Sequence, residues 1–264
     1  MNEKLDWNNL KTYNEKMQWA KLYDNNDLKT TLTDKYLVRD WVKDKVGEKY
    51  LIPLLGVWET FDEIDFDHLP QKFVLKTNHG SGTNMIIKNK KELDKNKARE
   101  QFTKWLRLNY AYLSGFEMHY KHIKPKIIAE KYIVDNDGEL KDYKFLCFNG
   151  EVYFCWIDVG RFGDHRRNVY NLNWELQPWT QHKYKNTDKP VPKPKNFDLM
   201  VDLASELCEG FPHVRVDFYN VDGKVYFGEM TFTNGSGFER IHPYKYNLML
   251  GELWNLPIGI NKEK

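Results

Sequence analysis

A lysine at the end of an apolar stretch leads directly into a glycine-rich loop. Residues 73–76 read Phe-Val-Leu-Lys, and the loop at residues 76–84 reads KTNHGSGTN. Phosphate is bound by backbone N–H groups that approach it closely, which glycine permits, and a lysine adds positive charge. A buried lysine is costly unless it meets an anion. The residue order is neither a Walker A nor a Rossmann motif. The loop therefore predicts another kind of phosphate site, with a plain turn as the alternative.

Two carboxylates lie on what read as adjacent strands near the end of the chain. Arg215 and Asp217 alternate along VRVDFY, so they share one strand face. The turn Asp222-Gly223 predicts a hairpin whose return strand brings Glu229 near Asp217. Two carboxylates among aromatic residues repel unless a cation lies between them, and Mg²⁺ binds one or two carboxylates with phosphate oxygens and water. We expect a metal site here, with outward-pointing surface charges as the alternative.

A basic segment, RFGDHRR, contains Arg161, His165, Arg166 and Arg167. It reads as a solvated loop. The alternative is an anion site for a substrate carboxylate, because a guanidinium fork suits carboxylates. Asp164 would then orient one of the arginines.

The elements that must position these residues follow from periodicity and turn chemistry. Hairpin turns at Asp137-Gly138, Asn149-Gly150 and Asp222-Gly223 predict an antiparallel sheet in the second half. Apolar spacing and capping residues predict helices near residues 5–23, 33–47, 91–110 and 197–208. The Lys- and Pro-rich residues 183–195 predict a solvated, mobile loop.

Composition excludes several classes of protein. The 264 residues carry a net charge of only +2, which gives no case for nucleic-acid binding. Three cysteines without a repeating spacing argue against a disulfide framework or a zinc site. No window approaches the ~20 apolar residues of a membrane span, and no signal peptide is apparent. We expect a cytoplasmic protein without a membrane span.

The order of several motifs resembles the TupA-like ATP-grasp proteins of polysaccharide gene clusters, over about residues 32–240. The stretch VRVDFYNVDGKVYFGEMTFTNGSG also resembles the C-terminal half of D-alanine:D-alanine ligases. The motifs that carry the family resemblance are DKYLVRDWV, FVLKTNHGSGTN, AEKYI, DYKFLCFNG, VRVDFY and GEMTFTNGSGFE.

The resemblance implies an α+β fold, the ATP-grasp fold, in which two α+β subdomains with antiparallel sheets enclose ATP. It implies an N-terminal helical segment (1–30), an N-terminal subdomain with the phosphate loop (31–128) and a C-terminal subdomain with the metal site (129–264).

The resemblance also assigns residue roles, with ATP and Mg²⁺ as cofactors. Phosphates would be contacted by Lys35, Lys76 and the loop residues Ser81, Gly82, Thr83 and Asn84. Adenine would be bound by the hinge residues Glu130, Lys131, Tyr132 and Ile133, and Lys144 would lie on the phosphate or ribose side. Arg215 and Lys76 would be catalytic residues. The metal ion would be bound by Asp217, Glu229 and Thr231.

Two departures from the family pattern matter. The usual third metal ligand is an asparagine, where this chain has Thr231, and Asn234 is the alternative ligand. Many relatives carry a full N-terminal α/β domain that helps to bind the second substrate, whereas only a short helical segment precedes Lys35 here. The acceptor site therefore cannot be inferred from the ligases, and Arg161, Arg166 and Arg167 are its candidates.

Three functions stay open at this point, besides a nucleotide-binding regulatory module without turnover. The first is an ATP-dependent carboxylate–amine ligase that forms an acyl phosphate on a small-molecule or sugar acceptor for a surface polysaccharide such as a capsule. The second is a kinase with the same nucleotide site. The third is a glycosyltransferase or sugar-binding accessory protein, supported by the 15% aromatic content and the gene-cluster association.

Overall fold

The computed structural model describes residues 5–113, 115–135, 138, 140–160, 164–181 and 184–257. Three residues of the sequence predictions lie outside the described residues: Arg161 of the basic segment, Asp137 of the first hairpin turn and Lys183 of the Lys/Pro loop. The chain divides into two compact units, residues 26–134 and residues 1–25 with 135–264. We call them the central unit and the terminal unit.

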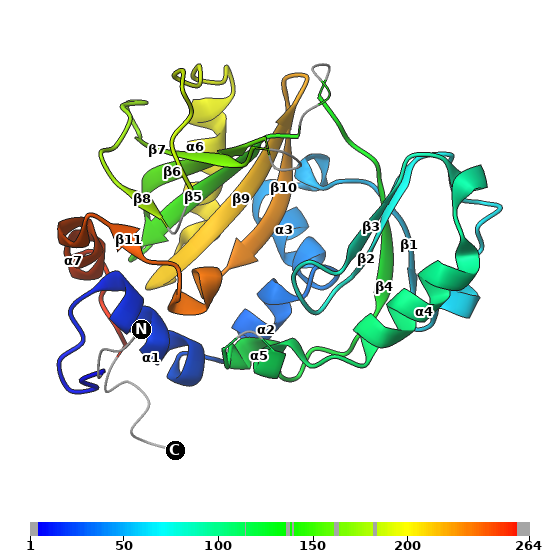
Figure 1. The fold of residues 1–264 in the computed structure, drawn as a ribbon, viewed down its shortest axis with the longest axis horizontal. Coiled ribbons are helices and arrows are strands. Elements are labelled where there is room, and N and C mark those ends of the chain that lie inside the picture. Colours follow the sequence, from blue (N-terminus) through cyan, green and yellow to red (C-terminus); the bar gives the residue numbers. More distant parts are fainter. Residues whose placement is uncertain are drawn as a thin grey trace. The chain divides into compact units, whose positions relative to one another are not determined.

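The central unit contains a four-stranded antiparallel sheet with strand order β1-β4-β2-β3 (Figure 1). Its strands are β1 (Leu54–Trp58), β2 (Phe73–Thr77), β3 (Asn84–Ile87) and β4 (Ile127–Lys131). Its helices are α2 (Asp27–Thr33), α3 (Val38–Val46), α4 (Lys95–Leu106) and α5 (Tyr110–Leu113), with 3-10 turns η1 (Glu48–Tyr50), η2 (Phe61–Glu63), η3 (Lys90–Glu92) and η4 (Met118–Tyr120). Phe73 and Leu75 of β2 are buried in a core with Phe102 of α4. Strand alternation therefore directs Lys76 to the other face of the sheet.

The terminal unit contains a five-stranded antiparallel sheet with strand order β10-β9-β5-β6-β7 (Figure 1). These strands are β5 (Asp142–Phe148), β6 (Glu151–Val159), β7 (Arg166–Asn171), β9 (His213–Val221) and β10 (Lys224–Thr231). The other elements are α1 (Tyr13–Tyr23), α6 (Phe197–Cys208), α7 (Tyr244–Glu252), the 3-10 turn η5 (Asn234–Gly237) and the strand pair β8 (Thr180–Gln181) and β11 (Ile241–His242).

Helix α6 packs against β5, β6 and β9, and its Phe197 ring lies 5.8 Å from that of Phe145. Apolar residues such as Phe145 alternate along these strands with charged residues such as Lys144. One face of the sheet is therefore apolar, and the opposite face carries the charges.

The N-terminal helix belongs to the terminal unit. Tyr13 and Met17 of α1 are fully buried in one core with Phe148 and Trp254. The boundary after the central unit follows Val134, because β4 pairs with both β1 and β2. These limits differ from the expected division at residues 30 and 128, which would cut through β4.

Several local predictions are confirmed. The turns at Asn149-Gly150 and Asp222-Gly223 join β5 to β6 and β9 to β10, and α6 spans the predicted residues 197–208. The three cysteines are buried free thiols. Among the described residues, no helix has the length and apolar character needed to span a membrane.

Other boundaries were wrong. The helix expected from residue 5 begins only after Thr12, whose side chain caps α1 together with Glu15. The helix expected at 33–47 is interrupted, because the Asp34 carboxylate accepts hydrogen bonds from the backbone N–H groups of Tyr36 and Leu37 before α3 begins. The helix expected at 91–110 is shorter, since α4 begins after the capping Asp94.

Candidate functional site

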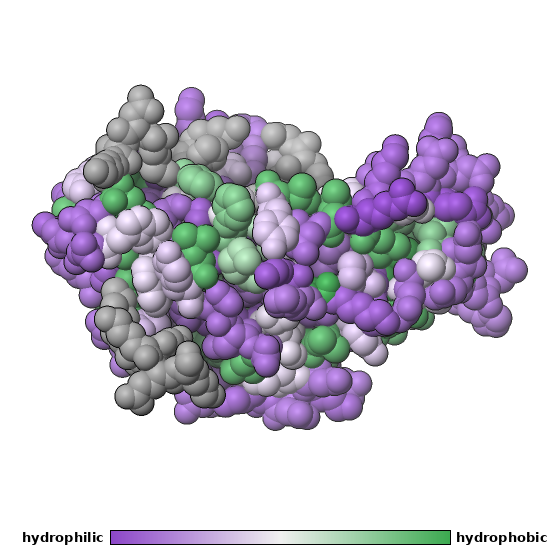
Figure 2. Space-filling model, turned by 90° about the horizontal axis from the view of Figure 1, so that it is seen from below, coloured by the Kyte–Doolittle hydropathy of each residue, from purple (hydrophilic) through white to green (hydrophobic). Residues whose placement is uncertain are grey.

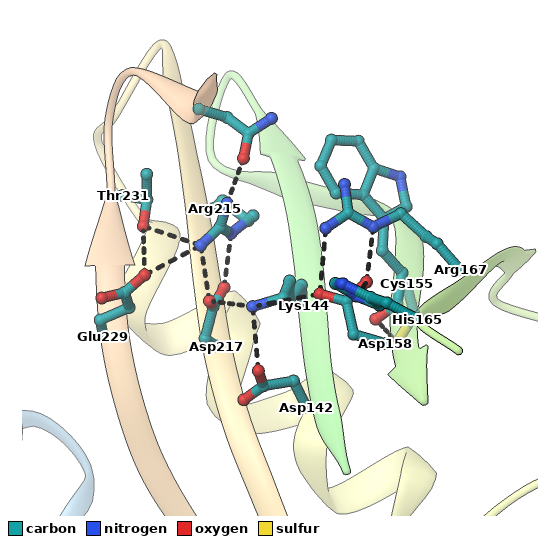
Figure 3. A network of polar contacts seen from close by, with 12 residues as sticks. Asp142, Lys144, Cys155, Asp158, His165, Arg167, Arg215, Asp217, Glu229 and Thr231 are labelled. Carbon is teal, nitrogen blue, oxygen red and sulfur yellow. Dashed lines mark hydrogen bonds and ion pairs between the residues drawn. The ribbon is translucent and has the colours of Figure 1, made fainter. Parts of the chain in front are cut away.

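Charged side chains form a continuous row across the polar face of the terminal sheet (Figure 3). Strand register builds this row. Glu229 of β10 pairs with Asp217 of β9, which in turn pairs with Lys144 of β5. On the next strands, Asp158 of β6 pairs with Arg167 of β7. The hairpin thus brings Glu229 beside Asp217 as the sequence predicts.

The guanidinium of Arg215 lies at the centre of the proposed metal ligands. Its Nε and Nη2 donate to the two carboxylate oxygens of Asp217 at 2.7 and 2.6 Å. Nη2 also donates to Glu229 at 2.9 Å and to the Thr231 hydroxyl at 3.0 Å, and Nη1 donates to the amide oxygen of Asn234. The cation between the two carboxylates in this structure is therefore an arginine of the chain itself.

Lys144 is buried and meets three carboxylates. Its Nζ lies 3.1 Å from Asp217, 3.3 Å from Asp142 and 3.7 Å from Asp158. Burial by itself would lower the pKa of Lys144, but Asp142 and Asp217 outweigh this effect and the pKa lies above its usual value. Lys144 is therefore a permanent cation that holds Asp217 in place.

Arg167 lies at the other end of the row and is buried, contrary to the expectation of a solvated loop. It donates to both oxygens of Asp158 at 2.6 and 3.0 Å and to Gln181 at 2.7 Å. Burial favours protonation of Asp158, yet the hydrogen bonds and charge of Arg167 hold the pKa of this carboxyl well below its usual range. His165 lies 3.3 Å from the same carboxylate.

Arg166 differs from its neighbour, because its partners are exposed. It contacts Asp164 at 2.7 Å, as the sequence suggested, and Asp188 at 3.4 Å. Both arginines stand at the start of β7 rather than in a loop. Arg167 is occupied by an internal partner, so Arg166 is the better exposed of the two described candidates for the acceptor.

The donor set of the cluster suits Mg²⁺. Carboxylate, hydroxyl and amide oxygens of Asp217, Glu229, Thr231 and Asn234 converge on one cation position, and Mg²⁺ prefers oxygen ligands. The carboxylates of the row (Asp142, Asp158, Asp217, Glu229) outnumber its cations (Lys144, Arg167, Arg215) by one. Among the described residues, no group of three or more His, Cys, Asp or Glu side chains forms a metal site. A metal here would therefore depend on two carboxylates completed by neutral oxygens.

Asn234 adds a feature that points to an anionic ligand. Its side chain is 3% exposed, and its Nδ2 donor has no hydrogen-bond partner among the described residues. A buried donor without a partner costs free energy that a phosphate oxygen would offset. The residues therefore fit both a divalent cation and a phosphate.

The glycine-rich loop lies in the central unit beside two lysines. Lys76 pairs with Glu130 at 2.7 Å, and Arg39 pairs with the same carboxylate at 3.3 Å. The Lys35 ammonium donates to the carbonyl oxygen of Gly80 at 2.5 Å. The three cations of this group, Lys35, Lys76 and Arg39, outnumber the two carboxylates beside them, Glu130 and Asp34, which suits an anion.

The remaining predicted nucleotide residues lie in the loop between β2 and β3, at the start of β3, and at and just after the end of β4. Ser81, Gly82 and Asn84 are exposed, whereas the Thr83 hydroxyl lies 2.6 Å from that of Thr77. Lys131 ends β4 and is exposed, and Tyr132 and Ile133 follow it half-buried.

Sequence reasoning missed Arg39, Asp142 and Asp158. Arg39 lies on α3, far from Glu130 along the chain, and no local pattern signals their contact. Asp142 and Asp158 each stand at the end of an apolar strand, and a carboxylate that ends a buried strand is the signal that could have found them.

No curated protein matches the sequence. The chain is similar to a D-alanine–D-alanine ligase from Bacillus anthracis complexed with ATP, with 16% identity, 78% of this chain and 56% of that chain covered, and a TM-score of 0.48. It is similar to the D-alanine–D-alanine ligase from Helicobacter pylori, with 14% identity, 86% and 59% covered, and a TM-score of 0.48. It is also similar to phosphoribosylamine–glycine ligase from Thermotoga maritima, with 14% identity, 80% of this chain and 51% of that chain covered, and a TM-score of 0.47.

The chain spans little more than half the length of these three proteins. The family model described as TupA-like ATPgrasp, in contrast, matches residues 15–255, which is nearly all of this chain. The protein therefore belongs to the TupA-like ATP-grasp family and has an ATP-grasp fold.

Proposed function

We propose that this protein is an ATP- and Mg²⁺-dependent ligase that activates a carboxylate as an acyl phosphate for amide formation, in the biosynthesis of a surface polysaccharide. The observation that carries the proposal is the cluster of Asp217, Glu229, Thr231 and Asn234 around Arg215, in a chain of the ATP-grasp family. Because the reaction consumes ATP, we place it in the cytoplasm.

The nucleotide is bound by residues of the central unit. Lys35, Lys76 and the loop residues 81–84 contact its phosphates, and Glu130 with residues 131–133 binds adenine. The excess of positive charge around Glu130 supports this assignment, since phosphate is polyanionic. On ATP binding, Lys76 exchanges its ion pair with Glu130 for phosphate oxygens.

Asp217 and Glu229 would hold Mg²⁺, with Thr231 or Asn234 as a neutral oxygen ligand. When bound, the ion neutralises phosphate charge. Arg215 then has to release at least one carboxylate, and its guanidinium becomes available to the transferring phosphoryl group. Lys144 keeps Asp217 in place during this exchange, because its contacts with Asp142 and Asp158 are independent of Arg215.

The reaction consists of two successive nucleophilic displacements. An oxygen of the acceptor carboxylate attacks the γ-phosphorus, the bond to the β-γ bridging oxygen breaks, and ADP leaves. An amine then attacks the acyl carbon, inorganic phosphate leaves with the bonding electrons, and the amine gives up a proton. Arg215 opposes the negative charge that develops on the phosphoryl oxygens.

Hydroxylamine trapping tests the proposal. The protein is incubated with ATP, Mg²⁺, hydroxylamine and a pool of uronic acids and amino acids, and the products are identified by mass spectrometry. A ligase yields a hydroxamate with ADP and phosphate, and the Asp217→Asn variant yields none. A stable phosphorylated product without phosphate release would establish a kinase instead. Turnover of a UDP-sugar without ATP would establish a glycosyltransferase.

A further inference from the structure

A pocket of about 430 Å³ lies within the terminal unit, between α1, η5, β11 and α7. Its volume falls in the range of small-molecule sites. Its lining includes Glu15 and Gln18 of α1, and Phe238, Arg240, His242 and Tyr244 of the segment that follows η5. We call it the η5 pocket.

The wall of this pocket is held by hydrogen bonds from one face of α1. Asn14 donates to the carbonyl oxygens of Gly237 and Glu239 at 3.1 and 2.9 Å. Gln18 and Lys21 donate to the carbonyl oxygen of Ser236 at 3.3 and 3.1 Å. Gly237 has a φ of +71°, and a Cβ on it would lie 2.5 Å from the Gln18 side chain, so glycine is required. The pocket is therefore built into the folded unit.

The pocket is joined to the charged row by η5 itself. Asn234, the first residue of η5, accepts a hydrogen bond from Arg215, and the same turn continues into the pocket wall at Gly237. A ligand in the η5 pocket would thus be in contact with the turn that carries a proposed metal and phosphate residue.

The rim of the pocket combines three kinds of chemistry. Arg240 and His242 are exposed, and neither has an ion pair or side-chain hydrogen bond within the described parts of the chain. Phe238 and Tyr244 present aromatic rings that are 54% and 61% exposed. Glu15 uses one carboxylate oxygen for the backbone N–H groups of Lys11 and Thr12.

These groups select among ligand classes. Guanidinium and imidazole N–H groups donate hydrogen bonds to a carboxylate, and an aromatic ring covers the apolar face of another ring. Glu15 would repel a plain anion but accepts hydrogen bonds from hydroxyl groups. Inorganic phosphate would leave the aromatic rings uncovered, and an apolar ring would leave the polar lining unpaired. A polyhydroxylated ring with a carboxylate provides a partner for the basic side chains, for the aromatic rings and for Glu15. Figure 2 shows apolar and hydrophilic residues interspersed on the face seen from below, rather than one broad apolar surface.

We propose that the η5 pocket binds a sugar acid and is the acceptor subsite of this protein. The role of acceptor subsite rests on the proposed function, whereas the sugar-acid ligand rests on the residues of the pocket alone. It assigns the carboxylate to Arg240 and a sugar face to Tyr244. It also gives α1 a role, because side chains of α1 hold one wall of the pocket.

Ligand-observed NMR tests the binding part. The probes are methyl glucuronide and methyl galacturonide, each compared with the uncharged methyl glucoside. Wild-type protein should bind one of the uronides at least tenfold more tightly than the glucoside. Arg240→Gln should abolish that preference, and Tyr244→Ala should weaken both sugars. Lys245→Gln is the matched control, because Lys245 is an exposed cation of the same segment that does not line the pocket.

The result that would overturn the proposal is equal binding of uronides and glucoside, or equal loss in Arg240→Gln and Lys245→Gln. The two proposals fail separately. If a uronide binds but hydroxamate never forms from it, the sugar-acid site is supported and the ligase reaction is refuted. If hydroxamate forms but Arg240→Gln leaves the KM of the carboxylate substrate unchanged, the ligase reaction is supported and the role of the η5 pocket as acceptor subsite is refuted.

Discussion

Replacing Arg215 with methionine should destabilise the protein and strengthen its response to Mg²⁺. Methionine keeps most of the side-chain volume but removes a guanidinium that contacts Asp217, Glu229, Thr231 and Asn234. Both Asp217 and the guanidinium are buried, so the variant leaves a carboxylate short of one cation. Breaking a buried ion pair in this way costs about 3–5 kcal/mol of unfolding free energy. That is a large part of the ~5–15 kcal/mol that stabilise a domain.

Magnesium should recover part of this loss. In the wild type the ion has to displace Arg215 from the carboxylates, whereas in the variant the position is free of a competing cation. Binding to the folded state stabilises by about 2.7 kcal/mol when the ion is present at 100 times its Kd. The gain on adding Mg²⁺ should therefore be larger in Arg215→Met than in the wild type, by about 1 kcal/mol or more.

The assay is urea unfolding followed by tryptophan fluorescence, in EDTA and in Mg²⁺. Arg166→Met is the matched control, since its partners Asp164 and Asp188 are exposed and screened by water. Its unfolding midpoint should barely change in either buffer. An Arg215→Met midpoint equal to the wild type in EDTA, or the same Mg²⁺ gain in both proteins, would refute the assignment of this cluster as a cation site shared by arginine and metal.

Three further predictions concern single side chains. Lys76→Ala should weaken ATP binding at least tenfold in calorimetry and leave the fold intact, and unchanged affinity would contradict the phosphate-loop assignment. Asp217→Asn and Glu229→Gln should each suppress Mg²⁺-dependent ATP turnover strongly in an ADP-release assay, with Thr231→Ala milder, and equal severity would identify Thr231 as a full metal ligand. Burial lowers the pKa of His119 to about 3, so the unfolded state binds more protons than the folded state below pH ~6.5. Stability should therefore fall by about 2 kcal/mol between pH 7 and pH 5, and His119→Asn should remove that share of the slope in urea titrations.

The local order of the site could be predicted from the sequence. A type I′ turn signal such as Asp222-Gly223 needs only neighbouring residues, and once the hairpin forms, the pairing of Glu229 with Asp217 follows from counting along two strands. The same local reasoning predicted the hairpin turn at Asn149-Gly150. It also predicted that Arg215 and Asp217 share one face of their strand. Family motifs added the fold, because their order along the chain is specific even where each motif is short.

Tertiary structure decided which cation meets which carboxylate. The sequence predicts that a cation must separate Asp217 from Glu229, but only the packed sheet shows Arg215 in that position and Lys144 between Asp142, Asp158 and Asp217. It also decided that α1 builds a wall on η5 instead of forming a separate segment. The physical reason is that strand pairing and helix capping depend on residues close in sequence. A buried charge, in contrast, is stabilised by whichever partners the fold brings within a few ångströms, and those partners lie on strands and helices far apart along the chain.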